Sequence, residues 1–218
     1  MAIVNGRVID GAGNPWLRVD IGIRDGKIAF IGRISRADAE EVIITPGAKF
    51  ALFAAILSIC DMNSEVLVHD PSWPTYEAMA VLAGSTVRYY PFGDLNELEE
   101  MITERTRAIV VNNPCNPTGE IFDGMAHLAD IAREHDLYII SDEVYSFLTY
   151  DGGFVSLGSM DRVRDRAIIV GGFSKTYAMT GWRIGFMVGP REVIDAANKI
   201  QQTAVTCASS ISQLAALV

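Results

Sequence analysis

Three short stretches of this 218-residue chain hold the side chains that could carry chemistry. They are residues 112–119 (NNPCNPTG), residues 141–145 (SDEVY) and residues 171–177 (GGFSKTY), and Arg183 follows the last of them. Together they offer amides, carboxylates, a phenol, an amine and a guanidinium. Solvated loops often carry such groups singly, so three rich stretches in one chain indicate a functional site.

Each stretch directly follows a run of apolar residues, at 108–111, 137–140 and 167–170. Short continuous apolar runs are typical of strands that are buried on both faces of a parallel sheet. Ligands of open parallel sheets bind beyond the carboxyl ends of the strands. We therefore expect the three stretches to meet at one edge of the sheet.

A further group points to an anion. Pro46, Gly47, Ala48 and Lys49 precede a helix that is expected to begin near Phe50. The first N–H groups and the positive dipole end of a helix favour an anion. Together with Arg183, this helix start suggests a phosphate.

Two nucleotide-binding motifs are excluded because glycines that they require are missing. A P-loop requires glycine directly before the Lys-Thr pair, and Ser174 occupies that position. A dinucleotide fingerprint requires a third glycine and a following helix, and the sequence after Gly11 and Gly13 provides neither.

Pyridoxal 5′-phosphate (PLP) would use a phosphate anchor, a lysine, a carboxylate, a phenol and an amide together. A lysine amine holds the PLP aldehyde as a Schiff base, and a carboxylate keeps the pyridine nitrogen protonated so that the ring acts as an electron sink. A phenol and an amide bind the 3′ oxygen, and an aromatic side chain covers the ring.

Residues 42–218 resemble the class I (fold-type I) PLP-dependent aminotransferases of the aspartate aminotransferase-like group. The matching blocks, in order, are VIITPGAKFALFAAI, HDPSWPTYEAMAVLAG, RAIVVNNPCNPTGEIF, LYIISDEVYSFLTYDG and VGGFSKTYAMTGWRIGFMVGP. The resemblance implies a PLP-binding large domain and the transfer of an amino group from an amino acid to a 2-oxo acid.

The resemblance also implies a role for each matching residue. Lys175 would form the Schiff base and, once freed, would shuttle a proton. Asp142 would pair with the pyridinium nitrogen, and Tyr145 and Asn116 would contact the 3′ oxygen. Trp73 would stack on the ring.

The phosphate would be held by Arg183, Ser174 and the backbone amides of Gly47, Ala48 and Lys49. We expect the remaining candidates to be structural: Tyr76, His69, His127 and His135.

The alternation of elements over residues 42–218 predicts an α/β, three-layer architecture with a mostly parallel sheet. Further strands are expected at 65–68, 86–90 and 184–188. Helices are expected at 76–84, 95–106, 125–135, 193–202 and 210–217.

Residues 1–41 have a different texture, a meander of short strands with Asn5-Gly6 and Asp25-Gly26 at turns. The sequence IVNGRVIDGAGNPWLRVDIGIRDGKIAFIG resembles the opening β-strands of D-aminoacylase/dihydroorotase-type amidohydrolases. The metal site of that family needs a His-x-His pair, whereas the three histidines here are isolated, so no metal is expected.

Composition excludes several classes of protein. Half of the residues are hydrophobic and only 21% are charged, which rules out a largely disordered chain. A net charge of −9 argues against nucleic acid or anionic lipid as a partner. The longest apolar stretch, FALFAAILSIC, is too short for a bilayer, and the N-terminus lacks a signal-peptide pattern. Three scattered cysteines favour a reducing, cytoplasmic location.

The resemblance stops before the C-terminal small domain, which in the family bears the arginine that holds the substrate α-carboxylate. We therefore expect PLP binding with impaired transamination, and a possible homodimer. Three alternatives stay open: a non-catalytic PLP-fold module, a PLP-dependent β-lyase and, with least support, a metal amidohydrolase.

Overall fold

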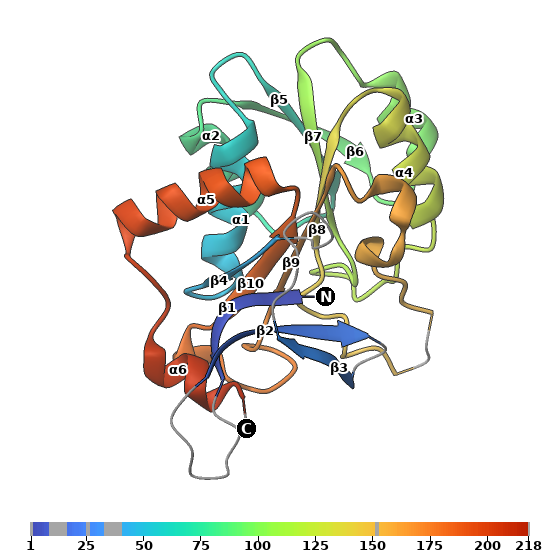
Figure 1. Ribbon diagram of the computed structural model, residues 1–218. Helices are drawn as coiled ribbons and strands as arrows, with labels where there is room; N and C mark the ends of the chain where they lie inside the picture. Colours follow the sequence, from blue (N-terminus) through green and yellow to red (C-terminus); the bar gives the residue numbers. More distant parts are fainter. Residues whose placement is uncertain (1, 9–16, 25–26, 33–40, 151–152, 218) are drawn as a thin grey trace. The chain divides into compact units, whose positions relative to one another are not determined.

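A computed structural model describes residues 2–8, 17–24, 27–32, 41–150 and 153–217 (Figure 1). The chain divides into two compact units, Met1–Val42 and Ile43–Val218. The candidate site lies in the second unit, which is described first.

A seven-stranded mixed sheet forms the centre of the second unit, in the order β4-β10-β9-β8-β7-β5-β6. The strands β5 to β9 pair in parallel, and β10 runs antiparallel to β9. The strand bounds are β4 Glu41–Thr45, β5 Glu65–Asp70, β6 Thr86–Pro91, β7 Thr106–Asn112, β8 Tyr138–Asp142, β9 Ala167–Gly172 and β10 Gly185–Gly189.

Helices cover both faces of this sheet. Figure 1 shows α1, α2 and α5 on one face and α3 and α4 on the other. The bounds are α1 Ala48–Ile59, α2 Thr75–Leu82, α3 Leu95–Glu100, α4 Met125–Glu134, α5 Arg191–Ala204 and α6 Ser210–Ala215. None of the helices within the described ranges is long and apolar enough to cross a bilayer.

The central strands are buried on both faces, as their apolar runs predict. Val66, Val110, Ile140 and Ile168 belong to one core with the small residues of α1, such as Ala55. Small side chains let a helix lie close to a sheet, and close packing excludes water from the core. The predicted α/β three-layer fold with a mostly parallel sheet is confirmed.

Some element boundaries differ from the predictions. The helix predicted over 95–106 ends at Glu100, because Thr106 already begins β7. The intervening turn is held by side chains: the Thr103 N–H donates to Thr106 Oγ1 at 2.9 Å, and the Thr103 hydroxyl donates to Glu65 at 2.7 Å. Strand β4 at Glu41–Thr45 was not predicted.

The first unit contains a three-stranded antiparallel sheet of β1 Ala2–Val8, β2 Leu17–Arg24 and β3 Lys27–Gly32. Arg24 pairs with Lys27, so two residues join β2 and β3. The predicted turn residues Asp25 and Gly26 themselves lie outside the described residues. The predicted turn at Asn5-Gly6 is wrong, because β1 continues through it with a register shift between Ile3 and Gly6.

Candidate functional site

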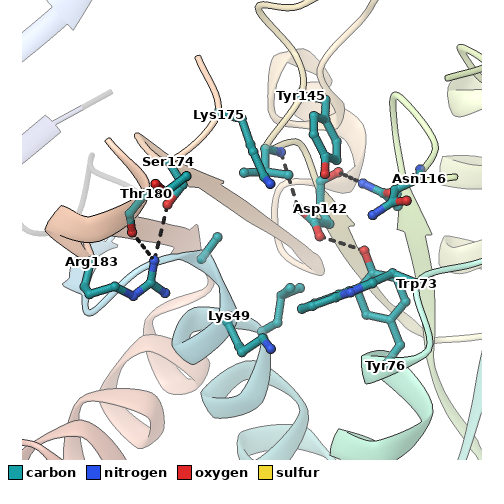
Figure 2. A pocket seen from close by; sticks show the side chains of 14 residues that line it. Lys49, Trp73, Tyr76, Asn116, Asp142, Tyr145, Ser174, Lys175, Thr180 and Arg183 are labelled. Carbon is teal, nitrogen blue, oxygen red and sulfur yellow. Dashed lines mark hydrogen bonds between the residues drawn. The ribbon is translucent and has the colours of Figure 1, made fainter. Parts of the chain in front are cut away.

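The candidate residues gather around one cavity of about 330 Å³ in the second unit. The predicted residues that line it are Ala48, Lys49, Trp73, Asn116, Asp142, Tyr145, Ser174, Lys175 and Arg183. Gly47 directly precedes Ala48 at the start of α1. The loops that follow β5, β7, β8 and β9 therefore meet at one edge of the sheet, as the parallel arrangement requires (Figure 2).

Asp142 ends β8 and its side chain is buried, with 3% of the residue exposed. Its carboxylate accepts hydrogen bonds from the Tyr76 hydroxyl at 2.6 Å and from the Val144 N–H at 3.2 Å. Burial raises the pKa of Asp142 to about 6, and the two hydrogen bonds oppose that rise. The site thus holds a desolvated carboxylate that would be stabilised by a cation.

Tyr76 belongs to this site, which corrects the prediction that it is purely structural. It lies in the first turn of α2, lines the cavity and donates to Asp142. Burial and the neighbouring Asp142 carboxylate raise the pKa of the Tyr76 phenol well above its ordinary value, so the phenol stays protonated as a donor. Nothing in the sequence separates Tyr76 from a core tyrosine, since the partner carboxylate is 66 positions away.

Replacing Tyr76 by phenylalanine is expected to raise the pKa of Asp142 further. The lost hydrogen bond is one of the two interactions that favour the ionised carboxylate, while the burial that disfavours it remains. A pH titration of the Asp142 carboxyl carbon by NMR measures the change. Tyr138→Phe, at the opposite end of β8, is the matched control, and an equal pKa in Tyr76→Phe and in the unmodified protein would contradict the expectation.

Lys175 extends from the loop that follows β9, and its side chain is exposed. Its Nζ lies 5.8 Å from the centroid of the Tyr145 ring. The loop turns back on the sheet, because the Phe173 N–H donates to the Ile184 carbonyl and the Tyr177 N–H donates to the Phe173 carbonyl. Lys175 and Asp142 therefore reach one cavity from neighbouring strands.

Arg183 lies beside the N-terminus of α1. It adopts a left-handed backbone conformation, and its Nη1 donates to the Thr180 carbonyl at 2.9 Å and to Ser174 Oγ at 3.4 Å. Gly47 has φ +82°, and a Cβ at that position would collide with the Arg183 guanidinium. Glycine is needed here both for the backbone conformation and for the close approach of the guanidinium to the helix start.

The other wall of the cavity is aromatic. The Trp73 ring lies edge-on to Tyr76, with centroids 5.4 Å apart, and Lys49 Nζ lies 4.9 Å from the Trp73 ring centroid. In the view of Figure 2, Arg183 lies at one end of the cluster with Ser174 and Thr180, Asn116 and Trp73 lie at the other end, and Asp142 lies near the middle.

Asn112 is a second residue that the sequence reasoning missed. Its side chain accepts the Asn116 N–H at 2.7 Å and donates to the Asp142 carbonyl oxygen at 3.0 Å. It thereby ties the loop after β7 to the end of β8. Its place at the end of an apolar strand was the available signal, but its partners are only visible in the fold.

The three histidines lie outside the cavity lining. His127 is exposed on α4, and His135 Nε2 lies 3.2 Å from a Glu99 carboxylate oxygen. His69 is fully buried at the end of β5. Over the described ranges, no cluster of three or more His, Cys, Asp or Glu side chains could hold a metal ion.

The residues present fit PLP by their chemistry. An amine, a buried carboxylate that calls for a cationic partner, and a guanidinium beside a helix start surround one cavity. The first N–H groups of a helix lack acceptors within the helix and suit a phosphate. Because Gly47 has no side chain, the Arg183 guanidinium can lie close to the start of α1, where it would complete such a phosphate site.

Comparison with known proteins gives a family match. Residues 26–218 match the model of the family "Aminotransferase class I and II". The match begins before residue 42, where the resemblance was predicted to start.

Curated relatives and solved structures agree with the family match. The aspartate aminotransferase of Thermotoga maritima is 36% identical over 208 residues, covering 89% of this chain and 55% of the relative. A (5-formylfuran-3-yl)methyl phosphate transaminase of Methanocaldococcus jannaschii is 40% identical over 178 residues, covering 82% and 47%. A double mutant of Thermus thermophilus aspartate aminotransferase has a TM-score of 0.79 and 38% identity, covering 81% and 48%. The chain spans about half the length of the curated relatives it matches.

Proposed function

We propose, on the premise that this chain belongs to the class I and II aminotransferases, that it binds PLP and serves amino group transfer from an amino acid to a 2-oxo acid. The observation that carries the proposal is the meeting of Lys175 and the buried Asp142 at one cavity, with Arg183 beside the α1 N-terminus. When bound, the cofactor would supply the electron sink for the transfer.

Each group would hold a different part of the cofactor. Arg183, Ser174 and the first amides of α1 would bind the phosphate. Asp142 would pair with the protonated ring nitrogen, and Tyr145 and Asn116 would bind the 3′ oxygen. Trp73 would cover one face of the ring. The common lining of one cavity supports these assignments.

Lys175 would hold the aldehyde carbon through its Nζ and, once released, would accept and return a proton at the substrate α-carbon. Its exposed side chain supports this role, because the amine must leave one partner and reach another. The Nζ of Lys175 faces the ring of Tyr145, so this ring would limit the directions that the amine can sample.

Substrates and activity are proposed with one restriction. The chain spans about half of its relatives' length. The resemblance to the aminotransferases implies that the arginine for the substrate α-carboxylate belongs to a small domain outside residues 42–218. A bidentate arginine–carboxylate contact supplies charge-assisted hydrogen bonds worth roughly 1.5–3 kcal/mol each. We therefore propose that these 218 residues bind PLP and that their turnover is impaired.

The test is covalent capture of the cofactor. The protein is saturated with PLP, reduced with borohydride and digested, and its peptides are mapped by mass spectrometry. We expect a single pyridoxyl adduct on Lys175. Turnover with aspartate, an aromatic amino acid and alanine against 2-oxoglutarate is measured in parallel, and family-typical rates would contradict the impairment.

Other outcomes separate the competing functions. The absence of any adduct and of visible absorbance would favour a non-catalytic module that keeps only the fold. Release of ammonia and pyruvate from cysteine conjugates in excess of amino transfer would favour a β-lyase.

We also propose that residues 1–41 form a separate β unit of amidohydrolase type and that residues 42–218 form the PLP-binding unit. The three-stranded sheet in the first segment and the resemblance of its sequence support the first part. A homodimer and a cytoplasmic location are proposed from the family and from the free thiols of Cys60, Cys115 and Cys207.

A further inference from the structure

His69 is a fully buried histidine whose two ring nitrogens both have partners. The Asn112 N–H donates to Nε2 at 3.1 Å, and Nδ1 lies 2.8 Å from the Pro71 carbonyl oxygen. A backbone N–H only donates, and a carbonyl oxygen only accepts. These partners therefore select the neutral imidazole that carries its hydrogen on Nδ1.

The two partners of His69 lie where two different loops of the candidate site begin: Pro71 directly follows β5, and Asn112 is the last residue of β7. Pro71 precedes Trp73 and Tyr76, which form the aromatic wall of the cavity. Asn112 accepts the N–H of Asn116 and thereby shapes the loop that follows β7. A single imidazole thus joins the loop that carries the ring-stacking side chain to the loop that carries the amide.

The surroundings keep the imidazole in place and uncharged. Its ring packs edge-on against Phe92, with centroids 5.0 Å apart, and against Tyr90 at 6.4 Å. The Cys115 thiol points to the same Pro71 carbonyl at 3.7 Å. Burial lowers the pKa of His69, although the Pro71 carbonyl and the nearby Asp70 carboxylate favour the charged form. A second hydrogen, on Nε2, would face the Asn112 N–H and break that bond.

We propose that His69 is a positioning residue of the cofactor site, which fixes the distance between the Trp73 loop and the Asn116 loop. It is absent from the cavity lining, so it acts through these loops and not by contact with the cofactor. The proposal rests on the proposed function, because it requires that the cavity binds PLP.

Three substitutions of His69 test its two hydrogen bonds separately. The amide of His69→Asn reaches the place of Nδ1 and can keep the bond to Pro71, whereas the amide of His69→Gln reaches the place of Nε2 and can keep the acceptor for Asn112. His69→Leu keeps neither. We expect the Kd for PLP to rise about tenfold in the Asn and Gln variants and about a hundredfold in the Leu variant, because each loss leaves a buried group without a partner.

The control is His127→Gln, which changes an exposed histidine on α4. The Kd is measured by absorbance titration well below the unfolding temperature of each variant, and the absorbance maximum of the bound cofactor is recorded. A positioning role predicts a shifted maximum and partial rescue by Asn and Gln relative to Leu. A Kd within twofold of the unmodified protein in all three variants would overturn the proposal.

A measurement on the unmodified protein covers the case in which the variants do not fold. Long-range ¹H–¹⁵N NMR at pH 7.5 should show the His69 ring protonated on Nδ1 alone. Protonation on Nε2 would overturn the proposal. Failure of the unmodified protein to bind PLP would instead refute the proposed function, so the two failures are distinguishable.

Discussion

Replacement of Lys175 by alanine is expected to abolish covalent capture of PLP and any amino transfer that the chain supports. The variant removes the amine that is proposed to bind the aldehyde, which lies on the loop after β9 next to the Tyr145 ring. Arg183, the α1 N-terminus and Asp142 remain, so PLP should still bind without a covalent bond. Loss of a positioned proton carrier alone costs about 10²–10⁴-fold in rate.

The measurement is the borohydride adduct, read by mass spectrometry of the whole protein and of its peptides. Lys49→Ala is the matched control, because Lys49 lines the same cavity but lies over Trp73 at the start of α1. The control should keep the adduct at position 175. An adduct of undiminished yield in Lys175→Ala would show that another amine binds the aldehyde.

The sequence could predict those residues of the site that directly follow the ends of strands. Apolar runs mark β7, β8 and β9, and the residues that follow each run must meet because parallel strands end at one edge. Lys175, Asp142 and Asn116 follow from that rule alone, with the resemblance supplying their roles. The helix start at Gly47 and the distant Arg183 also meet as expected.

The supporting residues could not be predicted in the same way. Tyr76 and His69 have the burial and the residue types of ordinary core positions, and only the fold brings them to Asp142 and Asn112. Their hydrogen bonds join residues 66 and 43 positions apart. Periodicity in sequence describes neighbours within one element, so it contains no signal for such pairs.

The early end of α3 has a similar cause. The acidic run from Leu95 onward continues the helical pattern, but Thr103 finds partners outside the helix in Thr106 and Glu65. Glu65 is buried and pairs with the more exposed side chains of Arg105 and Arg88 as well, so the turn completes a cluster of partners around one buried carboxylate. Tertiary contacts of this kind override local propensity.

Replacing Asp142 by asparagine should weaken PLP binding and yet stabilise the protein without cofactor. The folded-state pKa of about 6 lies above the ordinary value of 3.8. The favourable contribution of the Asp142 side chain to the free energy of folding is therefore fully present below pH 3.8, and it is lost as the pH rises through about 6. Above that pH the buried charge costs about 3 kcal/mol, which the neutral amide avoids.

The expected signature has two parts. In chemical unfolding without PLP, Asp142→Asn should be more stable than the unmodified protein at pH 8, by up to about 3 kcal/mol, and the difference should vanish near pH 4. With PLP, the variant has lost the carboxylate that would pair with the ring nitrogen. Loss of one partner of a buried ion pair costs about 3–5 kcal/mol, so the Kd for PLP at pH 8 should rise at least about 10²-fold.

Glu143→Gln provides the matched control, because Glu143 is also buried, with a pKa that burial raises. Its carboxylate faces other partners, namely Ser141, Ser156 and the Leu157 N–H, and it does not line the cavity. Glu143→Gln should therefore keep the affinity for PLP. Equal losses of affinity in both variants would mean that the charge of this strand end, and not the Asp142 carboxylate, governs binding. An Asp142→Asn protein that is less stable than the unmodified one at pH 8 would contradict the expectation. It would show that the ionised Asp142 carboxylate stabilises the folded protein without cofactor.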